Sequence, residues 1–207
     1  MLITFEGIEG SGKSTQVDLL YETLTGNGYS VVKTREPGGT GFGEALRAVT
    51  LQNGLNVLPL PELLVFMAMR AQHVEEVIMP ALQEGMVVLC DRFVDATYAY
   101  QGHGRAMNLG IIETLNRLVT KGIRPNLTIL INLAARTGLK RKNALAVAKD
   151  RVEVEELAFH QTIQKAYLRM AREDPKRFYV VQGKDDRTVI QEAIWKKVAE
   201  LLENRGV

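Results

Sequence analysis

The chain has 207 residues, of which 46% are hydrophobic and 24% charged, and its formal net charge is +2. These values are ordinary for one soluble globular domain, and a small, dispersed positive charge argues against nucleic-acid binding. No apolar run reaches the roughly 18 residues of a membrane span, the chain opens on a strand pattern without a signal peptide, and its one cysteine, Cys90, cannot form an internal disulfide. We therefore expect a cytoplasmic protein that contacts neither nucleic acid nor membrane.

The first predicted strand, Leu2–Phe5, leads into the motif Gly7-x-x-x-x-Gly12-Lys13-Ser14, and a helical pattern follows. This strand–loop–helix order is the setting of a phosphate-binding loop, whose glycines bring backbone N–H groups against phosphate oxygens. Lys13 can reach the β- and γ-phosphates, and the Ser14 hydroxyl can coordinate Mg²⁺. The alternative is a glycine-rich turn that happens to hold a lysine. We expect these residues to bind a nucleoside triphosphate: Gly7, Ile8, Glu9, Gly10, Ser11, Gly12, Lys13, Ser14 and Thr15.

Apolar runs and helical patterns then alternate to the end of the chain. The predicted strands are Leu2–Phe5, Ser30–Thr34, Met86–Cys90, Leu127–Asn132 and Phe178–Val181. The predicted helices are Lys13–Thr25, Gly43–Gln52, Pro61–Gln83 with a kink at Pro80, Leu109–Lys121, Thr137–Lys142, Val152–Arg172 and Arg187–Asn204. This alternation predicts an α/β fold of three layers, a five-stranded parallel sheet with helices on both faces and ligands at the carboxyl ends of the strands. No linker is evident, so we expect one domain over residues 1–207.

The third predicted strand ends in a carboxylate, Asp91, which has the form of a second Mg²⁺ ligand beside the phosphate-binding loop. Arg92 follows directly and would bring a permanent cation into the same crevice; the alternative is a surface arginine at a strand exit. Basic residues also surround an alanine-rich stretch over 136–151. This segment is either a solvated helix end or a lid that closes over phosphates, with the lid itself at about 142–151.

Six segments, in register along nearly the whole chain, resemble one family. They are Phe5–Lys13, Thr34–Thr40, Phe66-x-x-x-Arg70, Asp91–Phe93, Ala99–Gly102 and Gly138–Arg141. Together they are similar to the motifs of bacterial thymidylate kinases, which are nucleoside monophosphate kinases with a P-loop. The resemblance implies the reaction ATP + dTMP → ADP + dTDP in dTTP biosynthesis, with Mg²⁺ as cofactor and a homodimer as the assembly.

The resemblance also implies roles for individual residues toward dTMP. Phe66 and Arg70 share a helix face, and in the family such a pair stacks on thymine and donates to its O4; from the residues alone, a core phenylalanine and a solvent arginine would be expected. The remaining implied contacts are Thr97 and Gln101 with the base edge, Tyr100 under the deoxyribose, Glu9 with the 3′-hydroxyl, and Arg35 and Arg92 with the 5′-phosphate. The family often has a cis proline at the position of Pro37.

The chain departs from the family in two places. Some members carry an arginine inside the P-loop, and others have glycine there and arginines in the lid. Gly10 places this chain with the second kind, yet its lid is rich in alanine, leucine and valine. Of the basic residues that remain, Arg141, Lys142, Lys149 and Arg151, we expect Arg141 or Arg151 to assist Lys13 and Arg92 at the transferring phosphoryl group. Phe93 stands where the family usually has a polar aromatic residue.

Three other interpretations remain for this sequence. The first is another P-loop kinase, acting on dCMP, AMP or a nucleoside; the Phe66 and Arg70 pair argues against it. The second is a GTPase-type switch, but the chain contains no Asn-Lys-x-Asp motif for guanine. The third, prompted by the altered lid, is a homologue that binds nucleotides without catalysis.

Overall fold

The computed structural model describes residues 1–144 and 150–203. One sheet contains the strands β1 (Leu2–Glu6), β2 (Val31–Arg35), β3 (Val87–Asp91), β4 (Leu127–Asn132) and β5 (Phe178–Gln182), in the order β2-β3-β1-β4-β5. All four pairings are parallel. The predicted fold class is confirmed, and each strand ends within one residue of its predicted bounds.

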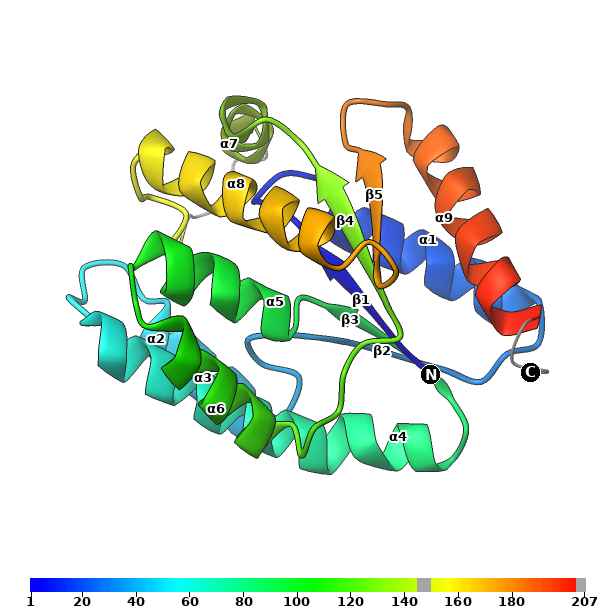
Figure 1. Cartoon of the computed structure of the whole chain (residues 1–207), viewed down its shortest axis with the longest axis horizontal. Coiled ribbons are helices and arrows are strands. Elements are labelled where there is room, and N and C mark those ends of the chain that lie inside the picture. Colours follow the sequence, from blue (N-terminus) through cyan, green and yellow to red (C-terminus); the bar gives the residue numbers. More distant parts are fainter. Residues whose placement is uncertain (145–149, 204–207) are drawn as a thin grey trace.

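Helices connect the strands and cover the sheet (Figure 1). The α-helices of the described residues are α1 (Lys13–Gly26), α2 (Gly41–Thr50), α3 (Pro59–His73), α4 (Met79–Gln83), α5 (Val94–Thr97), α6 (Leu109–Val119), α7 (Ala135–Ala144), α8 (Leu157–Glu173) and α9 (Arg187–Glu203). Two π-helical segments, η1 (Val74–Ile78) and η2 (Tyr98–Gly104), continue α3 and α5. None of the helices described is long and apolar enough to cross a membrane.

Alternation along the strands divides the core between the two faces. Ile3, Phe5 and Leu89 pack into one cluster with apolar residues of α1 and α9. Leu2 and Val88 point the other way, into a cluster with residues of η1 and α4. The same face is covered by α8 over β4 and β5. Because helices cover both faces of the central strands, β1, β3 and β4 are buried at nearly every position, as expected for a parallel sheet.

Three features of the helices differ from the sequence-based expectation. The segment predicted as one helix over 61–83 widens into the π-helical turn η1 just before Pro80, whose ring cannot donate to the preceding turn. The helix predicted from Val152 begins only at Leu157, because Asp150 Oδ1 accepts from two backbone N–H groups and closes a turn there. We did not predict α5 and η2, whose glycines and π geometry obscure the helical period.

The five strands end at the same edge of the sheet because they are parallel. The phosphate-binding loop follows β1, Glu36 follows β2, and Arg92 follows β3. In the register of the sheet, Phe5 lies opposite Asp91, which lies opposite Arg35. The fold therefore brings together three segments that are about 30 to 90 residues apart in the chain.

Candidate active site

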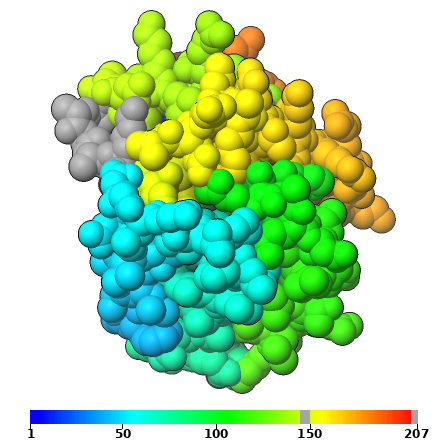
Figure 2. Space-filling view, turned by 90° about the vertical axis from the view of Figure 1, so that its left-hand side faces the viewer, coloured from blue at the N-terminus to red at the C-terminus, as the bar shows by residue number. Residues whose placement is uncertain are grey.

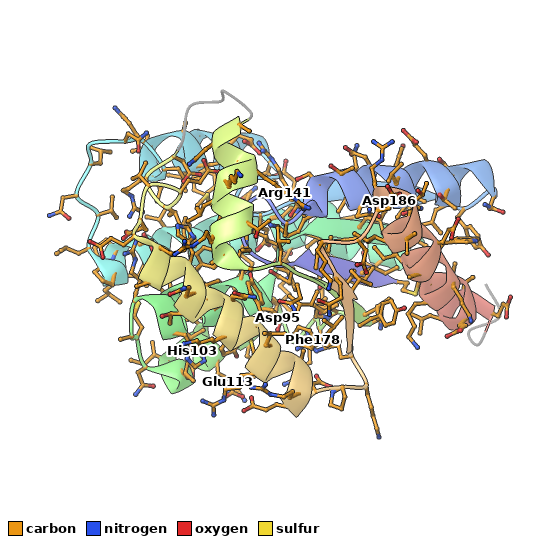
Figure 3. The ribbon with its side chains drawn as sticks, turned by 90° about the horizontal axis from the view of Figure 1, so that it is seen from above. Asp95, His103, Glu113, Arg141, Phe178 and Asp186 are labelled. Carbon is orange, nitrogen blue, oxygen red and sulfur yellow. The ribbon has the colours of Figure 1, made fainter. Side chains whose placement is uncertain are left out.

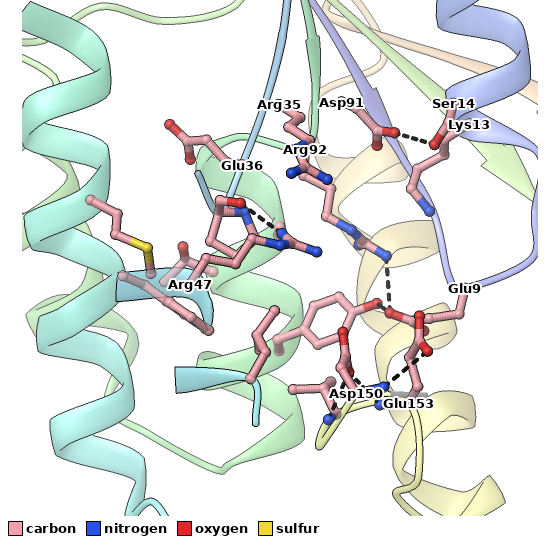
Figure 4. Close-up of a pocket in the computed structure, with 18 of the residues that line it drawn as sticks. Glu9, Lys13, Ser14, Arg35, Glu36, Arg47, Asp91, Arg92, Asp150 and Glu153 are labelled. Carbon is pink, nitrogen blue, oxygen red and sulfur yellow. Dashed lines mark hydrogen bonds and ion pairs between the residues drawn. The ribbon is translucent and has the colours of Figure 1, made fainter. Parts of the chain in front are cut away.

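A cleft of about 320 Å³ opens at this edge of the sheet (Figure 4). Most of the predicted site residues line it: Glu9, Gly10, Lys13, Ser14, Arg35, Phe66, Arg70, Asp91, Arg92, Thr97, Tyr100 and Gln101. The other predicted loop residues, Gly7, Ile8, Ser11, Gly12 and Thr15, belong to the same turn but do not contribute to its wall. The predicted catalytic arginines Arg141 and Arg151 do not line the cleft either.

The phosphate-binding loop has its lysine buried beneath it. Lys13 Nζ donates to the Ile8 carbonyl at 2.8 Å, so this side chain links the first residue of α1 to the start of the phosphate-binding loop. Burial, and after it the Arg92 charge, lower the pKa of Lys13 to about 8, against the attraction of Asp91 and Glu9. A bound polyphosphate would add negative charge beside this ammonium and stabilise its proton.

Gly10 lies where the loop touches the start of α7. Its φ is +69°, and a Cβ placed on it would lie 2.1 Å from the Gly138 carbonyl oxygen. A Cβ on Gly138 would in turn lie 2.3 Å from the Glu9 carbonyl oxygen. The two backbones therefore pack directly on each other, and a larger residue at position 10 would require α7 to move.

Ser14 and Asp91 form the predicted metal pair. Ser14 Oγ donates to Asp91 Oδ2 at 2.6 Å, which places two oxygen ligands side by side at the mouth of the loop. Mg²⁺ is usually held by one or two protein oxygens together with water and phosphate oxygens, so this donor set fits it. A protein-only cage is absent from the described residues, which contain no group of three or more metal-binding side chains.

Arg92 extends into the cleft from the end of β3. Its backbone has a φ of 71°, in the left-handed region, and this directs the side chain back over β1. Arg92 Nη2 donates to Glu9 Oε1 at 3.0 Å, and Nη1 donates to the Tyr167 hydroxyl at 3.2 Å. The guanidinium also lies 4.9 Å from the centre of the Tyr100 ring. Three side chains thus hold the cation, and Arg92 lines the cleft.

Glu9 is the carboxylate that balances Arg92. Oε1 also accepts from the Tyr100 hydroxyl at 2.5 Å, and Oε2 lies 3.2 Å from His160 Nδ1. Burial alone would raise the pKa of Glu9, but the Arg92 charge and the donors from His160 and Tyr100 outweigh it and hold this pKa below its usual range. Glu9 is therefore ionised at neutral pH and accepts hydrogen bonds only.

A second carboxylate, Glu6, supports this arrangement from the core. Glu6 Oε2 accepts from the Tyr167 hydroxyl at 2.7 Å, and Oε1 accepts from the Phe93 N–H at 2.8 Å. Burial, and after it the Asp95 charge, raise the pKa of Glu6 to about 7. Sequence reasoning missed Glu6, Tyr167 and His160. Only Glu6 carried a signal, a charged residue at the end of an otherwise apolar strand.

Arg70 lies at the other end of the cleft and is 4% exposed. Nε donates to Glu36 Oε2 at 2.7 Å, and Nη1 donates to Thr97 Oγ1 and Asn116 Oδ1 at 2.8 and 2.6 Å. Nη2 donates to the Phe93 carbonyl at 3.0 Å. Within the described residues these contacts use four of the five N–H groups of the guanidinium. One N–H of Nη2 remains for a ligand, and Phe66, half-buried, lines the same part of the wall.

Buried acceptors hold this end of the cleft in place. Glu36, after β2, is shared between Arg70 and His73, and His73 Nε2 lies 2.6 Å from Thr34 Oγ1. The Arg70 and His73 contacts outweigh burial and lower the pKa of Glu36. The peptide bond from Glu36 to Pro37 is cis, the isomer common in the family. Gln101 Nε2 donates to Glu62 Oε1 at 2.7 Å, which fixes the amide against the wall.

Two arginines approach the cleft from the side of β2 and α2. Arg35 is exposed and pairs with Glu44 at 2.8 Å. Arg47, which we did not predict, donates from Nη1 to the Pro37 carbonyl at 2.6 Å and also lines the cleft. Nothing in the sequence separates Arg47 from an ordinary basic residue in the last turn of a helix.

The basic residues of the predicted lid are only partly described. Arg141 lies on α7 (Figure 3). It donates to the Gly183 carbonyl at 2.8 Å. Arg151 donates to the Thr50 carbonyl at 3.2 Å and to Glu62 Oε2 at 2.5 Å. Lys142 pairs with Glu153 at 3.0 Å, and both line the cleft. Lys149 lies outside the described residues.

Comparison with known proteins identifies the family. The family model described as thymidylate kinase matches residues 5–194. A thymidylate kinase of Pelobacter propionicus is 48% identical over 209 residues, which cover 98% of this chain and 94% of that protein. One of Citrifermentans bemidjiense is 50% identical over 89% of this chain and 84% of its own. The crystal structure of thymidylate kinase from Ehrlichia chaffeensis superposes with a TM-score of 0.80 at 34% identity, covering 96% and 98% of the two chains.

The sheet order, the phosphate-binding loop and the arginine-lined cleft define a P-loop nucleotide kinase. Within that class, the chain belongs to the thymidylate kinase family. The family predicted from the six sequence motifs is therefore confirmed, as is the class of enzyme.

The pKa of Lys13 predicts a proton linkage on the donor side. In the free protein Lys13 is mostly neutral at pH 8.5, because its pKa is about 8. A bound triphosphate should raise this pKa, so that binding takes up roughly 0.7 proton at pH 8.5 and affinity falls as pH rises above 8. Calorimetric titration with ATP in two buffers of different ionisation enthalpy would measure the uptake.

The same titration at pH 7 and with the Lys13→Arg variant provides the controls. Lys13 is already charged at pH 7, and an arginine keeps its proton throughout, so neither experiment should show uptake by this residue. Binding at pH 8.5 without proton uptake by the unmodified protein would contradict the lowered pKa of Lys13.

Proposed function

We propose that the protein transfers the γ-phosphoryl group of ATP to dTMP, giving ADP and dTDP for the synthesis of dTTP and DNA. The observation that carries this proposal is the distribution of groups along one cleft. Lys13 and Arg92 lie at its phosphate end, and Phe66 with the free N–H of Arg70 lies at its far end. A nucleoside monophosphate joins the two kinds of partner, a planar base and an anion.

The donor triphosphate binds to the loop over Gly7–Thr15, where backbone N–H groups and the start of α1 favour phosphate oxygens. Ser14 and Asp91 would hold Mg²⁺, which would supply positive charge against the phosphate groups of the donor. Lys13 supplies a point charge beneath the loop. These are the contacts of the donor in our proposal.

The thymine base binds at the far end of the cleft. Phe66 stacks on the ring, and the remaining Nη2 N–H of Arg70 donates to O4. Thr97 and Gln101 border the same space, and both are held by partners, Thr97 by Arg70 and Gln101 by Glu62. Because these partners fix the donors before binding, little ordering cost remains for the ligand.

The sugar and the acceptor phosphate lie between these ends. Tyr100 packs under the deoxyribose, and Glu9 accepts from the 3′-hydroxyl. Arg35 and Arg92 bind the 5′-phosphate, and Arg47 adds a third charge at the same wall. Two or more guanidinium groups orient a phosphate oxygen well, since each presents paired donors.

In the transfer step, an oxygen of the dTMP phosphate forms a bond to the γ-phosphorus as the bond from that phosphorus to the β,γ-bridging oxygen breaks. The electron pair of the broken bond stays on ADP. Lys13 and Arg92 stabilise the charge spread over the transferring group, and the fixed positions of both substrates supply the rest of the catalysis. The reaction needs no separate general base.

A cation from the lid completes this charge stabilisation in our proposal. We retain Arg141 and Arg151 as the candidates. To reach phosphate oxygens, Arg141 would have to leave the Gly183 carbonyl. Arg151 would have to leave the Thr50 carbonyl and Glu62. Lys142, which already lines the cleft, is the alternative within the described residues.

Alanine substitution of each candidate tests the lid assignment. Replacing the residue that reaches the transferring group should lower the kcat of the enzyme by about 10³-fold or more. Arg172→Ala, on the exposed side of α8, serves as the control and should leave turnover unchanged. If Arg141→Ala and Arg151→Ala both retain full turnover, neither arginine has this role.

The family resemblance also leads us to propose a homodimer in the cytoplasm. Apolar side chains are exposed on two neighbouring helices, Leu60 and Leu64 on α3 and Ile111 and Leu118 on α6. Leu118 is 71% exposed. Figure 2 shows the face on which these parts of the chain, cyan to green, lie side by side. Exposed apolar patches of this kind are typical of interfaces between subunits.

Light scattering coupled to size exclusion should find the dimer mass at micromolar concentration. Leu64→Glu combined with Leu118→Glu should give monomers, because two charges would be buried unpaired at the interface. Val189→Glu, on α9, is the control and should not change the mass. A wild-type monomer would rule out the proposed assembly.

A coupled assay of ADP release with Mg²⁺-ATP tests the reaction itself. dTMP should be the best acceptor. dUMP, which lacks one methyl group, should be roughly 10–200-fold poorer in kcat/KM. dCMP presents an amino group where Arg70 requires an acceptor and should be rejected by about 10⁴-fold. AMP should be equally poor.

Other outcomes of this assay favour other functions. Faster turnover of dCMP or AMP would indicate a different monophosphate kinase, and a preference for GTP over ATP would favour a switch. Binding of dTMP without ADP release would identify a non-catalytic homologue.

A further inference from the structure

A buried histidine of α8, His160, contacts Glu9 of the candidate active site. The His160 side chain is fully buried, with 0% exposure. Its Nδ1 lies 3.2 Å from Glu9 Oε2, and the Phe159 ring packs edge-on against it at 5.6 Å between centroids. Nε2 has no hydrogen-bond partner among the described residues. A buried ring nitrogen without a partner costs about 1–3 kcal/mol, so stability alone does not account for a histidine here.

The carboxylate of Glu9 explains what this histidine does. Each carboxylate oxygen can accept about two hydrogen bonds. Oε1 already accepts two, from Arg92 and Tyr100, whereas His160 is the one partner of Oε2 among the residues that the structure describes. Glu9 lines the cleft. Oε2 is therefore the oxygen that can take one more donor, from a ligand.

The contact with His160 also fixes the direction of that oxygen. Arg92 and Tyr100 hold Oε1 alone, and with only those contacts combined changes of the Glu9 side-chain torsions could still swing Oε2 about the anchored Oε1. A donor on Oε2 removes this freedom. Because Glu9 is ionised and only accepts, the hydrogen shared by this pair is on His160 Nδ1.

We infer that His160 is a positioning residue, whose Nδ1–H holds Glu9 so that Oε2 receives the 3′-hydroxyl of the acceptor nucleotide. His160 does not touch the substrate. Its effect is selectivity for a sugar with a 3′-hydroxyl. This inference rests on the proposed function, since it assumes that a deoxynucleoside monophosphate binds beside Glu9.

Two nearly isosteric variants separate the hydrogen bond from the packing. In His160→Asn the amide nitrogen can occupy the position of Nδ1, whereas His160→Leu has a similar volume and no donor. Each is assayed with dTMP and with its 3′-deoxy analogue. The wild type should prefer dTMP by about 10–100-fold in kcat/KM, the range for a hydrogen bond to a charged group.

The preference for dTMP should fall below about 3-fold in His160→Leu and return to within about 3-fold of the wild-type value in His160→Asn. The KM for ATP should stay within about 2-fold in both, because the donor loop is not altered. His160→Gln provides a second loss-of-donor variant, since its amide lies near the position of Nε2 instead of Nδ1. It should lose the preference as His160→Leu does, and it keeps the test open should the leucine variant not fold. Thermal melting monitored by circular dichroism checks the fold of each.

The outcomes distinguish this inference from the proposed function. If the wild type phosphorylates dTMP and the variants without a donor keep its full preference over the 3′-deoxy compound, His160 has no such role. The same conclusion follows if the active wild type does not discriminate between the two compounds. If the wild type does not phosphorylate dTMP, the proposed reaction is wrong, and this inference is wrong with it.

Discussion

The site depends on the ion pair between Arg92 and Glu9. Arg92 leaves β3 in a left-handed conformation and turns back over β1, where a largely buried cation needs a compensating charge. Glu9 supplies it from inside the phosphate-binding loop, and Tyr167 joins the guanidinium to Glu6 at the end of β1. The pair thus links the loop, β3 and α8 at one point. Lys13, which feels both charges, has its pKa set by the same arrangement.

At the far end of the cleft, too, a buried arginine is held by a carboxylate and other acceptors. Arg70 is held by Glu36, Thr97 and Asn116, which come from the loop after β2, from α5 and from α6, and Glu36 in turn is held by His73. Networks of this kind contribute little net stability, because desolvation offsets the attraction of the charges. Their effect is geometric: almost every donor of the guanidinium has an assigned acceptor, and the one left over has a defined direction.

The phosphate-binding loop packs against α7, the helix that leads into the predicted lid. Gly10 and Gly138 pack backbone against backbone, so the P-loop has no room for an arginine while α7 is in this position. Two basic residues of the predicted lid are engaged elsewhere, Lys142 at the end of α7 with Glu153 and Arg151 with Glu62. Acidic residues therefore hold two of the three candidate lid cations, and transfer of either cation to phosphate oxygens would exchange one set of charge contacts for another.

The sequence by itself determined the fold class, the strand positions, the phosphate-binding loop and the family. Those features depend on local patterns, such as apolar runs, glycine spacing and a lysine at a fixed offset. Such patterns can be recognised in the sequence without knowledge of tertiary contacts. Most predicted site residues were also found along one cleft, because parallel strands bring their carboxyl ends to one edge. Only the tertiary structure revealed the partners of these residues. Glu9 meets His160, which is 151 residues away in the chain, and Arg47 reaches the cleft from a helix of ordinary appearance. Contacts between side chains that are distant in the sequence depend on how the elements pack, and the local periodicity of apolar residues carries no information about them.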